Sequence, residues 1–372
     1  MNRRLLLILG LITAAAVALA TLTGRDRHAE ETSASSAELV PGLSHAINQV
    51  ERIRLTAPEG DGVITIVRHR DGWTVAERDG YPVDAGQVRQ LLIRLSEART
   101  LEEKTADPAF YDRLGVADVT AESGSGVLIE LEGGVDASLI VGKQEPRSGR
   151  GTYVRRSESS GSLLVNQILE PGTTIADWVV RDIVDIPETA VARIDVLHAD
   201  GDKVHVRRDE SGTFVLANLP EERELSAAGG PSTMARALTG LRLDDVRAAA
   251  DDEPPEDATT ARFITEDGRE LTARLWQQDD TRLMAMQVSR AEPDEDAGDL
   301  VAEGMPDEDG DAGAADSGSG SEEQPAQVPD AELRVQNERL SGWTFTIPAW
   351  KSDQINRRLE DLLAPAPESE DG

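Results

Sequence analysis

Apolar and polar residues alternate in three short segments that begin just after residue 50. The segments are Arg52–Thr56, Val63–Arg68 and Trp73–Glu77, and turns rich in glycine and acidic residues separate them. Alternation with a period of two is typical of strands that have one buried and one exposed face. The pattern therefore predicts three strands joined by tight turns.

A helix is predicted directly after these strands, because apolar residues there recur at helical spacing and form one face. Asp84 is suited to the N-cap position, and Gln87 three residues later would complete a capping box. The apolar face consists of Val88, Leu91, Leu92 and Leu95. Four further strands are predicted over Val127–Glu132, Ser138–Val141, Thr152–Arg156 and Ser162–Val165.

The same order of elements recurs later in the chain, and six residues near its start recur at a constant offset of 141. The matching residues are Val50, Arg52, Ile53, Gly60, Asp61 and Val63 in the first copy and Val191, Arg193, Ile194, Gly201, Asp202 and Val204 in the second. A second helix face consists of Met234, Ala237, Leu238 and Leu241, with Ser232 as its cap. Strands then follow over Arg262–Thr265, Leu271–Trp276 and Arg282–Val288. Agreement between strands, turns and helix indicates an internal repeat.

An acidic segment interrupts the second copy. Residues 291–330 hold fourteen Asp or Glu and no Lys or Arg, so this segment is predicted to be disordered. Beyond it, SGWTFTI at 341–347 resembles SGSLLV at 160–165. We therefore interpret the segment as an insertion before the last strand of the second copy, and expect Trp343–Ile347 to pair with the 262–288 strands. The alternative is a disordered linker followed by an independent C-terminal helix.

These patterns predict an α+β fold with two tandem repeats of a mainly antiparallel β-sheet packed by helices. The first repeat spans residues 45–185. The second spans residues 186–365, contains a disordered acidic insertion at 291–335, and is followed by a tail at 366–372. A final helix is predicted to place Ile355, Leu359, Leu362 and Leu363 on one face.

The N-terminus predicts a membrane anchor. Residues 5–22 carry no charge and follow Arg3 and Arg4. As a helix they would span about 27 Å, close to the ~30 Å of a bilayer core. We expect one transmembrane helix within residues 1–24, a cytoplasmic positive flank and a flexible tether at 25–44. A signal peptide cleaved at Ala18-Leu19-Ala20 is the alternative, and either interpretation places the bulk of the chain in the periplasm, at the bacterial inner membrane.

The composition excludes several classes of function. The net charge is −32 and no basic block follows residue 30, which argues against binding to nucleic acid. The absence of cysteine removes disulfides, thiolate nucleophiles and thiolate zinc sites.

The sequence offers only weak candidates for metal-binding or catalytic residues. His198 and His205 could form a metal pair across a turn, but histidines on exposed strand surfaces are the favoured interpretation. Asp307, Asp309 and Asp311 alternate as in a calcium loop, yet the twelfth position, where an EF-hand needs Glu, is Gly318. We therefore predict no catalytic, cofactor-binding or metal-ligating residue, and no enzymatic activity.

The aromatic residues suggest one candidate surface. The chain has five tryptophans and few other aromatic residues, so core packing is expected for most of them. Trp350 lies outside the strand pattern and is expected to be exposed. Trp343 and Trp350 lie in the part of the second copy that departs most from the first, and are the candidate interaction surface.

Several motifs, in this order, resemble the bacterial family called domain of unknown function 4340. They are DGWTV at 71–75, FYDRLGV at 110–116, LIVGK at 139–143, TYVRR at 152–156, ARIDV at 192–196 and GWTFTIPAWKSDQINRRLEDLL at 342–363. The resemblance covers most of residues 45–365. It implies a membrane-anchored extracytoplasmic protein that is an accessory component of a gliding-type ABC transport system. It implies no catalytic residues.

The expected function is a non-catalytic, membrane-anchored accessory protein. Its partner would be an ABC transporter permease or an associated subunit, contacted through an exposed sheet edge or groove. The alternative is a module that binds a cell-envelope glycan or lipid in the cleft between the repeats. A hydrolase is least favoured, because the sequence singles out no pair of carboxylates held at a fixed separation.

Overall fold

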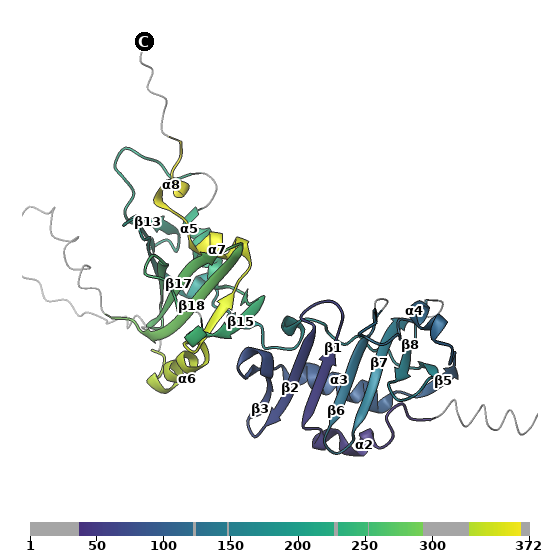
Figure 1. Ribbon diagram of the computed structural model, residues 1–372. Helices are drawn as coiled ribbons and strands as arrows, with labels where there is room; N and C mark the ends of the chain where they lie inside the picture. The colour runs from purple at the N-terminus through teal and green to yellow at the C-terminus, as the bar shows by residue number, and fades with distance from the viewer. Residues whose placement is uncertain are drawn as a thin grey trace, which may run out of the picture. The chain divides into compact units, whose positions relative to one another are not determined.

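The computed structural model describes residues 37–121, 124–146, 149–226, 230–251, 253–292 and 327–365. The chain divides into two compact units, with the boundary between Val180 and Arg181. Each unit is built on one large antiparallel sheet, and the described helices are few and short (Figure 1). The prediction of two mainly antiparallel sheets is therefore confirmed.

The first unit contains a nine-stranded sheet in the order β4-β3-β2-β1-β6-β7-β8-β9-β5. Its strands are β1 (Arg52–Thr56), β2 (Val63–His69), β3 (Gly72–Val75), β4 (Tyr81–Pro82), β5 (Thr100–Glu103), β6 (Val127–Glu132), β7 (Ala137–Gln144), β8 (Thr152–Arg156) and β9 (Ser162–Val165).

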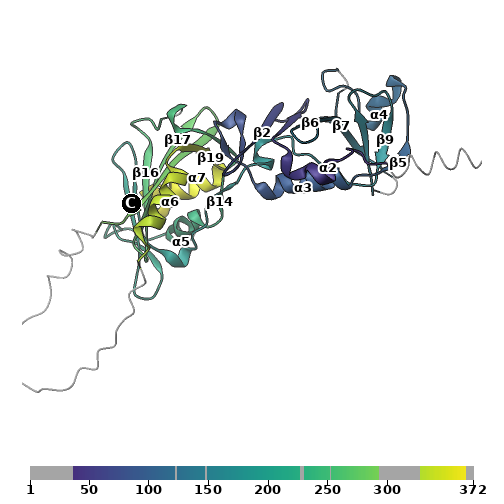
Figure 2. The ribbon, with the colours of Figure 1, turned by 90° about the horizontal axis from the view of Figure 1, so that it is seen from below.

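One face of this sheet is buried. Alternate residues such as Ile53 and Ile129 are fully buried, as the period of two requires. Helix α3 (Ala85–Glu97) covers this buried face, and α2 (Leu43–Ala46) contacts α3 (Figures 1 and 2). A short helix, α4 (Tyr111–Leu114), lies further along the chain.

The start of α3 is fixed by Asp84, as predicted, although with different geometry. The Asp84 carboxylate accepts a hydrogen bond from the backbone N–H of Gly86 at 2.7 Å. This bond replaces the predicted capping box, in which Gln87 would take part. It satisfies one of the free N–H groups at the start of the helix.

Removing this cap should weaken the first unit by a modest amount. We expect Asp84→Ala to lower the free energy of unfolding by about 1 kcal/mol, whereas Asp84→Asn, which keeps an acceptor oxygen, should restore most of it. Urea unfolding followed by circular dichroism measures both. Equal losses in the two variants would show that the cap contributes through something other than this acceptor.

The second unit repeats the topology of the first. Its eight-stranded sheet has the order β13-β12-β11-β16-β17-β18-β19-β15. The strands are β11 (Val191–Leu197), β12 (Lys203–Arg208), β13 (Phe214–Leu216), β15 (Asp245–Ala248), β16 (Thr259–Thr265), β17 (Arg269–Gln278), β18 (Thr281–Arg290) and β19 (Trp343–Thr346). Matching β11 to β1 and β16 to β6 reproduces the strand order of the first sheet. Two short strands, β10 (Asp182–Val184) and β14 (Leu241–Arg242), form a separate pair.

Each large sheet also contains a strand that the pattern of residues missed. β5 pairs with β9 and β15 pairs with β19, each at the far edge of its sheet. In β5 only Thr100 is buried, and the three residues after it are exposed. An edge strand that buries so little lacks the alternation from which strands are recognised.

The helices after the third strands differ between the copies. In the second copy, α5 (Gly230–Ala235) ends in a 3-10 turn, so Ser232 lies inside the helix rather than at its cap. Leu241, expected on the same helix, belongs to β14 because the chain turns at Gly240, whose φ is +57°. All four apolar residues of the predicted face are nevertheless buried.

The end of the second unit also differs from the prediction. The single helix expected at the C-terminus is divided into α7 (Ala349–Ile355) and α8 (Leu359–Leu362). Helices α5 and α7 contact each other, and both contact strands of the second sheet (Figure 2).

The beginning of the described chain corrects the predicted tether. Leu39 and Leu43 are both fully buried. The guanidinium of Arg156 donates hydrogen bonds to the backbone oxygens of Leu39 at 2.8 Å and Glu38 at 3.1 Å. The prediction of a flexible tether is therefore wrong from residue 37 onward, because its apolar residues pack into the first unit. The predicted transmembrane segment and the tail lie outside the described residues, among which no helix is long and apolar enough to span a membrane.

The strand beyond the acidic segment belongs to the second sheet. Phe345 of β19 lies opposite Met284 of β18, so the expected pairing is observed. The chain that carries the acidic segment therefore connects two neighbouring strands of one sheet.

Part of the region predicted to be disordered forms a helix. Helix α6 (Asp330–Leu340) buries Leu333 and Leu340, and the Asn337 side-chain oxygen accepts a hydrogen bond from the Val288 N–H at 3.0 Å. The prediction of disorder is thus wrong for residues 327–335, because this helix covers the edge of β18 that β19 leaves unpaired. Residues 293–326 lie outside the described structure.

Candidate interaction groove

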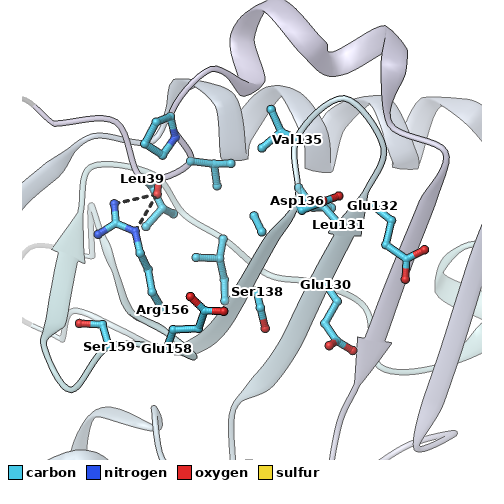
Figure 3. Close-up of a pocket in the computed structure, with 14 residues that line it drawn as sticks. Leu39, Glu130, Leu131, Glu132, Val135, Asp136, Ser138, Arg156, Glu158 and Ser159 are labelled. Carbon is cyan, nitrogen blue, oxygen red and sulfur yellow. Dashed lines mark hydrogen bonds between the residues drawn. The ribbon is translucent and has the colours of Figure 1, made fainter.

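A groove of about 540 Å³ opens in the first unit at the turn between β6 and β7 (Figure 3). Three parts of the chain that are distant in sequence form it: the segment around residue 40, the β6–β7 hairpin, and the end of β8 with the residues that follow it. The lining residues are Leu39, Val40, Pro41, Glu130, Leu131, Glu132, Val135, Asp136, Ala137, Ser138, Leu139, Arg156, Glu158 and Ser159.

The hairpin side of the groove depends on two consecutive glycines. Gly133 and Gly134 have φ of +93° and +71°, which other residues rarely adopt. A Cβ added to Gly134 would also lie 2.5 Å from the Cβ of Gln49. The Asp136 carboxylate accepts a hydrogen bond from the Gly133 N–H at 3.3 Å and helps to close the turn.

Arg156 and the N-terminal segment build the opposite side. Figure 3 shows the Arg156 guanidinium directed at the backbone oxygen of Leu39. Glu38, one residue earlier, forms an ion pair with Arg99 at 3.2 Å. These contacts hold the backbone of Leu39–Pro41 as a wall, and they use the only positive charge among the lining residues.

Carboxylates dominate the polar part of the groove. Glu130, Glu132, Asp136 and Glu158 all line it. Glu132 forms an ion pair with Arg52 at 2.6 Å and Glu130 one with Arg54 at 3.8 Å, whereas Glu158 is exposed. Leu131 and Leu139 also line the groove but are almost fully buried, whereas Val135 and Ala137 are half-buried and supply its accessible apolar surface. An apolar floor with a carboxylate rim suits a ligand that combines a cationic group with an apolar one.

The groove does not present an activated nucleophile. The hydroxyl of Ser138 donates a hydrogen bond to the hydroxyl of Ser157 at 2.8 Å, and the lining residues include no His or Lys that could act as a base. Among the residues that the structure describes, no group of three or more His, Asp or Glu could hold a metal ion.

The two tryptophans of the candidate surface occupy different environments. Trp350 lies in the first turn of α7 and is 59% exposed, as expected, with the Lys351 ammonium 4.9 Å from its ring centroid. Trp343 lies in β19 opposite Ala248 and is half-buried. The two indoles therefore differ in element and in exposure, and the groove contains neither of them.

The two histidines have separate structural partners. His198 is buried, which corrects the expectation of an exposed strand residue, and its ring bonds the backbone oxygen of Arg357 at 3.0 Å. The ring of His205 instead contacts the Asp195 carboxylate at 2.9 Å. The calcium-loop candidates Asp307, Asp309 and Asp311 lie outside the described residues.

The groove residues gave no signal in the sequence. Leu39 lay in the supposed tether, Glu158 in a turn, and Arg156 at the end of a predicted strand. Only the fold brings them together. The hairpin glycines were the one available clue, because a Gly-Gly pair between two strands predicts a tight turn but not a groove beside it.

The fold and the groove define a protein of two tandem antiparallel sheets with a carboxylate-lined groove in the first. The family described as Domain of unknown function (DUF4340) matches residues 73–261, just over half of the chain, and the chain belongs to this family. The match begins in β3 and ends in β16, so the motif at 342–363 lies beyond it. Comparisons with curated proteins and with solved structures gave no match.

Proposed function

We propose that the protein is a membrane-anchored, extracytoplasmic accessory protein that binds a subunit of an ABC-type transporter through the groove of its first unit. The observation that carries this proposal is which part of the chain forms one wall of the groove. Leu39–Pro41, which form it, follow closely after the predicted membrane anchor. The binding site and the membrane attachment are thus neighbours along the chain.

The length of the intervening chain limits how far the groove can lie from the bilayer. Residues 23–36 separate the predicted transmembrane segment from the first described residue. Fully extended, these residues span at most about 50 Å at 3.3–3.6 Å each. A partner that reaches the groove must therefore be close to the membrane surface, which favours an integral membrane subunit.

The charge of the groove indicates which part of such a partner it would bind. Among the described residues, Glu158 and Asp136 are the lining carboxylates without an ion pair, and they attract Lys or Arg side chains. The apolar lining residues accept an apolar side chain beside them. The matching element is an extracytoplasmic loop of the permease or associated subunit that carries basic and apolar residues.

Reversing the charge of one exposed lining residue tests this proposal. Glu158 is exposed and lines the groove, so Glu158→Lys should weaken the complex about tenfold through like-charge repulsion without disturbing the core. Affinity purification from detergent-solubilised membranes, with quantification of transporter subunits by mass spectrometry, measures the effect.

The matched control is Glu103→Lys, which reverses an exposed carboxylate of β5 that does not line the groove. It should recover the same subunits as the wild type. Failure of the wild type to recover any transporter subunit would count against the function. Equal recovery with Glu158→Lys would count against the groove as the binding site.

A further inference from the structure

The second sheet has one buried face and one open face. Residues such as Ile194, Val206 and Phe263 on the inner face are fully buried. The side chains between them point the other way and are mostly exposed or half-buried. We call these outward side chains of β11, β12, β15, β16 and β17 the basic face.

The basic face has the opposite sign to the protein as a whole. It carries six basic residues: Arg193, Lys203, Arg207, Arg247, Arg262 and Arg274. Its acidic residues are Asp195, Asp245 and Glu270. The face therefore has a net charge of +3 in a chain whose net charge is −32.

The pairing of the strands brings these charges together. Arg193 of β11 lies opposite Arg207 of β12, while Asp195 lies opposite both His205 and Arg262. Asp195 contacts Arg193 at 3.0 Å and the His205 ring at 2.9 Å. Within the described part of the chain, the side chains of Lys203, Arg207 and Arg262 have no hydrogen-bonding or ionic partner. Like charges this close on one face favour an anionic occupant.

The first sheet shows that the repeat does not require this charge. In the first copy, Arg52 and Arg54 of β1 are neutralised by Glu132 and Glu130 of β6. The positions on β16 that correspond to these two glutamates are occupied by Ile264 and Arg262. Asp195 occupies the position of Arg54, so these four positions carry a net charge of +1 in the second sheet and zero in the first.

The acidic segment occurs in the same copy as the basic face. Five residues, 157–161, connect β8 to β9 in the first copy, whereas residues 291–342 connect β18 to β19 in the second. The described residues on either side of 293–326 meet, because Arg290 contacts Gln327 at 3.3 Å and forms an ion pair with Asp330. The acidic segment therefore begins and ends at one end of the sheet that carries the basic face.

The segment is long enough to reach across the face. Strands β18 to β12 are five neighbours, about 19 Å apart in total at ~4.8 Å per step. Residues 293–326 could span several times that distance when extended. Both ends of the acidic segment are attached to the sheet. The effective concentration of the segment at the basic face is therefore in the millimolar range, and a weak electrostatic contact suffices for binding.

We propose that the acidic segment binds the basic face of the second sheet of its own chain. The charge complementarity, the attachment of both ends to β18 and its neighbours, and the occurrence of both features in one copy support this occupant. The proposal is independent of the groove in the first unit. It concerns a different sheet and a different partner.

The absence of native cysteine makes a direct measurement simple. One fluorophore is attached at Ala314→Cys in the acidic segment. The other is attached at Val215→Cys on β13, which lies opposite Arg207. The labelled full chain is kept in neutral detergent micelles. Energy transfer should be high at about 20 mM NaCl and should fall at about 500 mM, because salt screens the contact. Arg207→Glu combined with Arg262→Glu should lower the transfer at low salt to its high-salt value.

The control combines Arg70→Glu with Arg89→Glu, two exposed arginines of the first unit, and makes the same change in net charge. It should leave the transfer unchanged. Energy transfer that is insensitive to salt, or equal in the two double variants, would overturn the proposal.

A second experiment tests whether an anionic membrane, rather than the acidic segment, occupies the basic face. Vesicles that contain phosphatidylglycerol should bind a chain lacking residues 293–326 about tenfold more tightly than the full chain, because the segment no longer competes for the face. The Arg207→Glu and Arg262→Glu double variant of the shortened chain should lose this gain. Equal vesicle binding with and without the segment would mean that the segment does not occupy the face.

Discussion

Replacing Phe345 by alanine is expected to lower the free energy of unfolding of the second unit by about 3–5 kcal/mol. Phe345 is 1% exposed and lies in β19, between Met284 of β18 and Val246 of β15. The expected loss combines the transfer free energy of the ring with the cavity that it leaves. An effect of this size would show that the strand after the acidic segment is an integral part of the second core.

Chemical unfolding of the full chain, followed by tryptophan fluorescence and circular dichroism, measures this effect. Because the chain forms two compact units, the transition of the second unit should shift while that of the first stays in place. Val335→Ala on α6 is the control, since Val335 is 62% exposed and its truncation should change stability by less than about 0.5 kcal/mol. A loss below about 1 kcal/mol for Phe345→Ala would contradict the structure of this strand.

Lys351→Met should have the second largest effect, a loss of about 2–4 kcal/mol. Lys351 is only 4% exposed, and its ammonium donates hydrogen bonds to the backbone oxygens of Ala237 at 2.9 Å and Thr239 at 2.6 Å. A third bond reaches the oxygen of Arg236 at 3.3 Å. These carbonyls lie at or just beyond the end of the 3-10 turn after α5 and would be left buried without a donor. Lys203→Met, at an exposed lysine, should be nearly neutral.

The pH dependence of stability gives Lys351 a separate signature. Burial lowers the pKa of Lys351 from its usual 10.5, and the nearby Asp185 carboxylate only partly opposes this effect. The unfolded chain therefore binds this proton more tightly than the folded chain. The contribution of Lys351 to stability should rise as the pH increases toward 10.5, and Lys351→Met should lack this rise. Unfolding free energies measured across this range for both proteins test it, and parallel pH profiles would contradict the assignment.

The strands were predictable from the sequence where burial differs between their two faces. β1, β6 and β16 alternate because one face packs on the core and the other meets solvent. β5 and β15 were missed because edge strands are specified by pairing with a neighbour rather than by alternation. The helix of the second copy was overestimated because four apolar residues at helical spacing are buried there in three different local structures.

The groove could not be predicted, since its shape depends on contacts between distant residues. Nothing local indicates that Arg156 holds the backbone of Leu39, more than a hundred residues earlier. Likewise, Lys351 carried no sign of burial, because a lysine is normally exposed and its three acceptors are backbone oxygens.

By itself, the sequence determined the repeat, the main strands of both sheets and the place of the acidic segment within the second copy. These follow from local periodicity and from similarity between two parts of one chain, which need no knowledge of distant contacts. The tertiary structure alone decided the ordering of residues 37–46, the carboxylate-rimmed groove and the basic face of the second sheet. Each of these depends on which side chains meet across strands, because strand register, rather than local sequence, places Arg207 beside Arg193 and Glu132 beside Arg52.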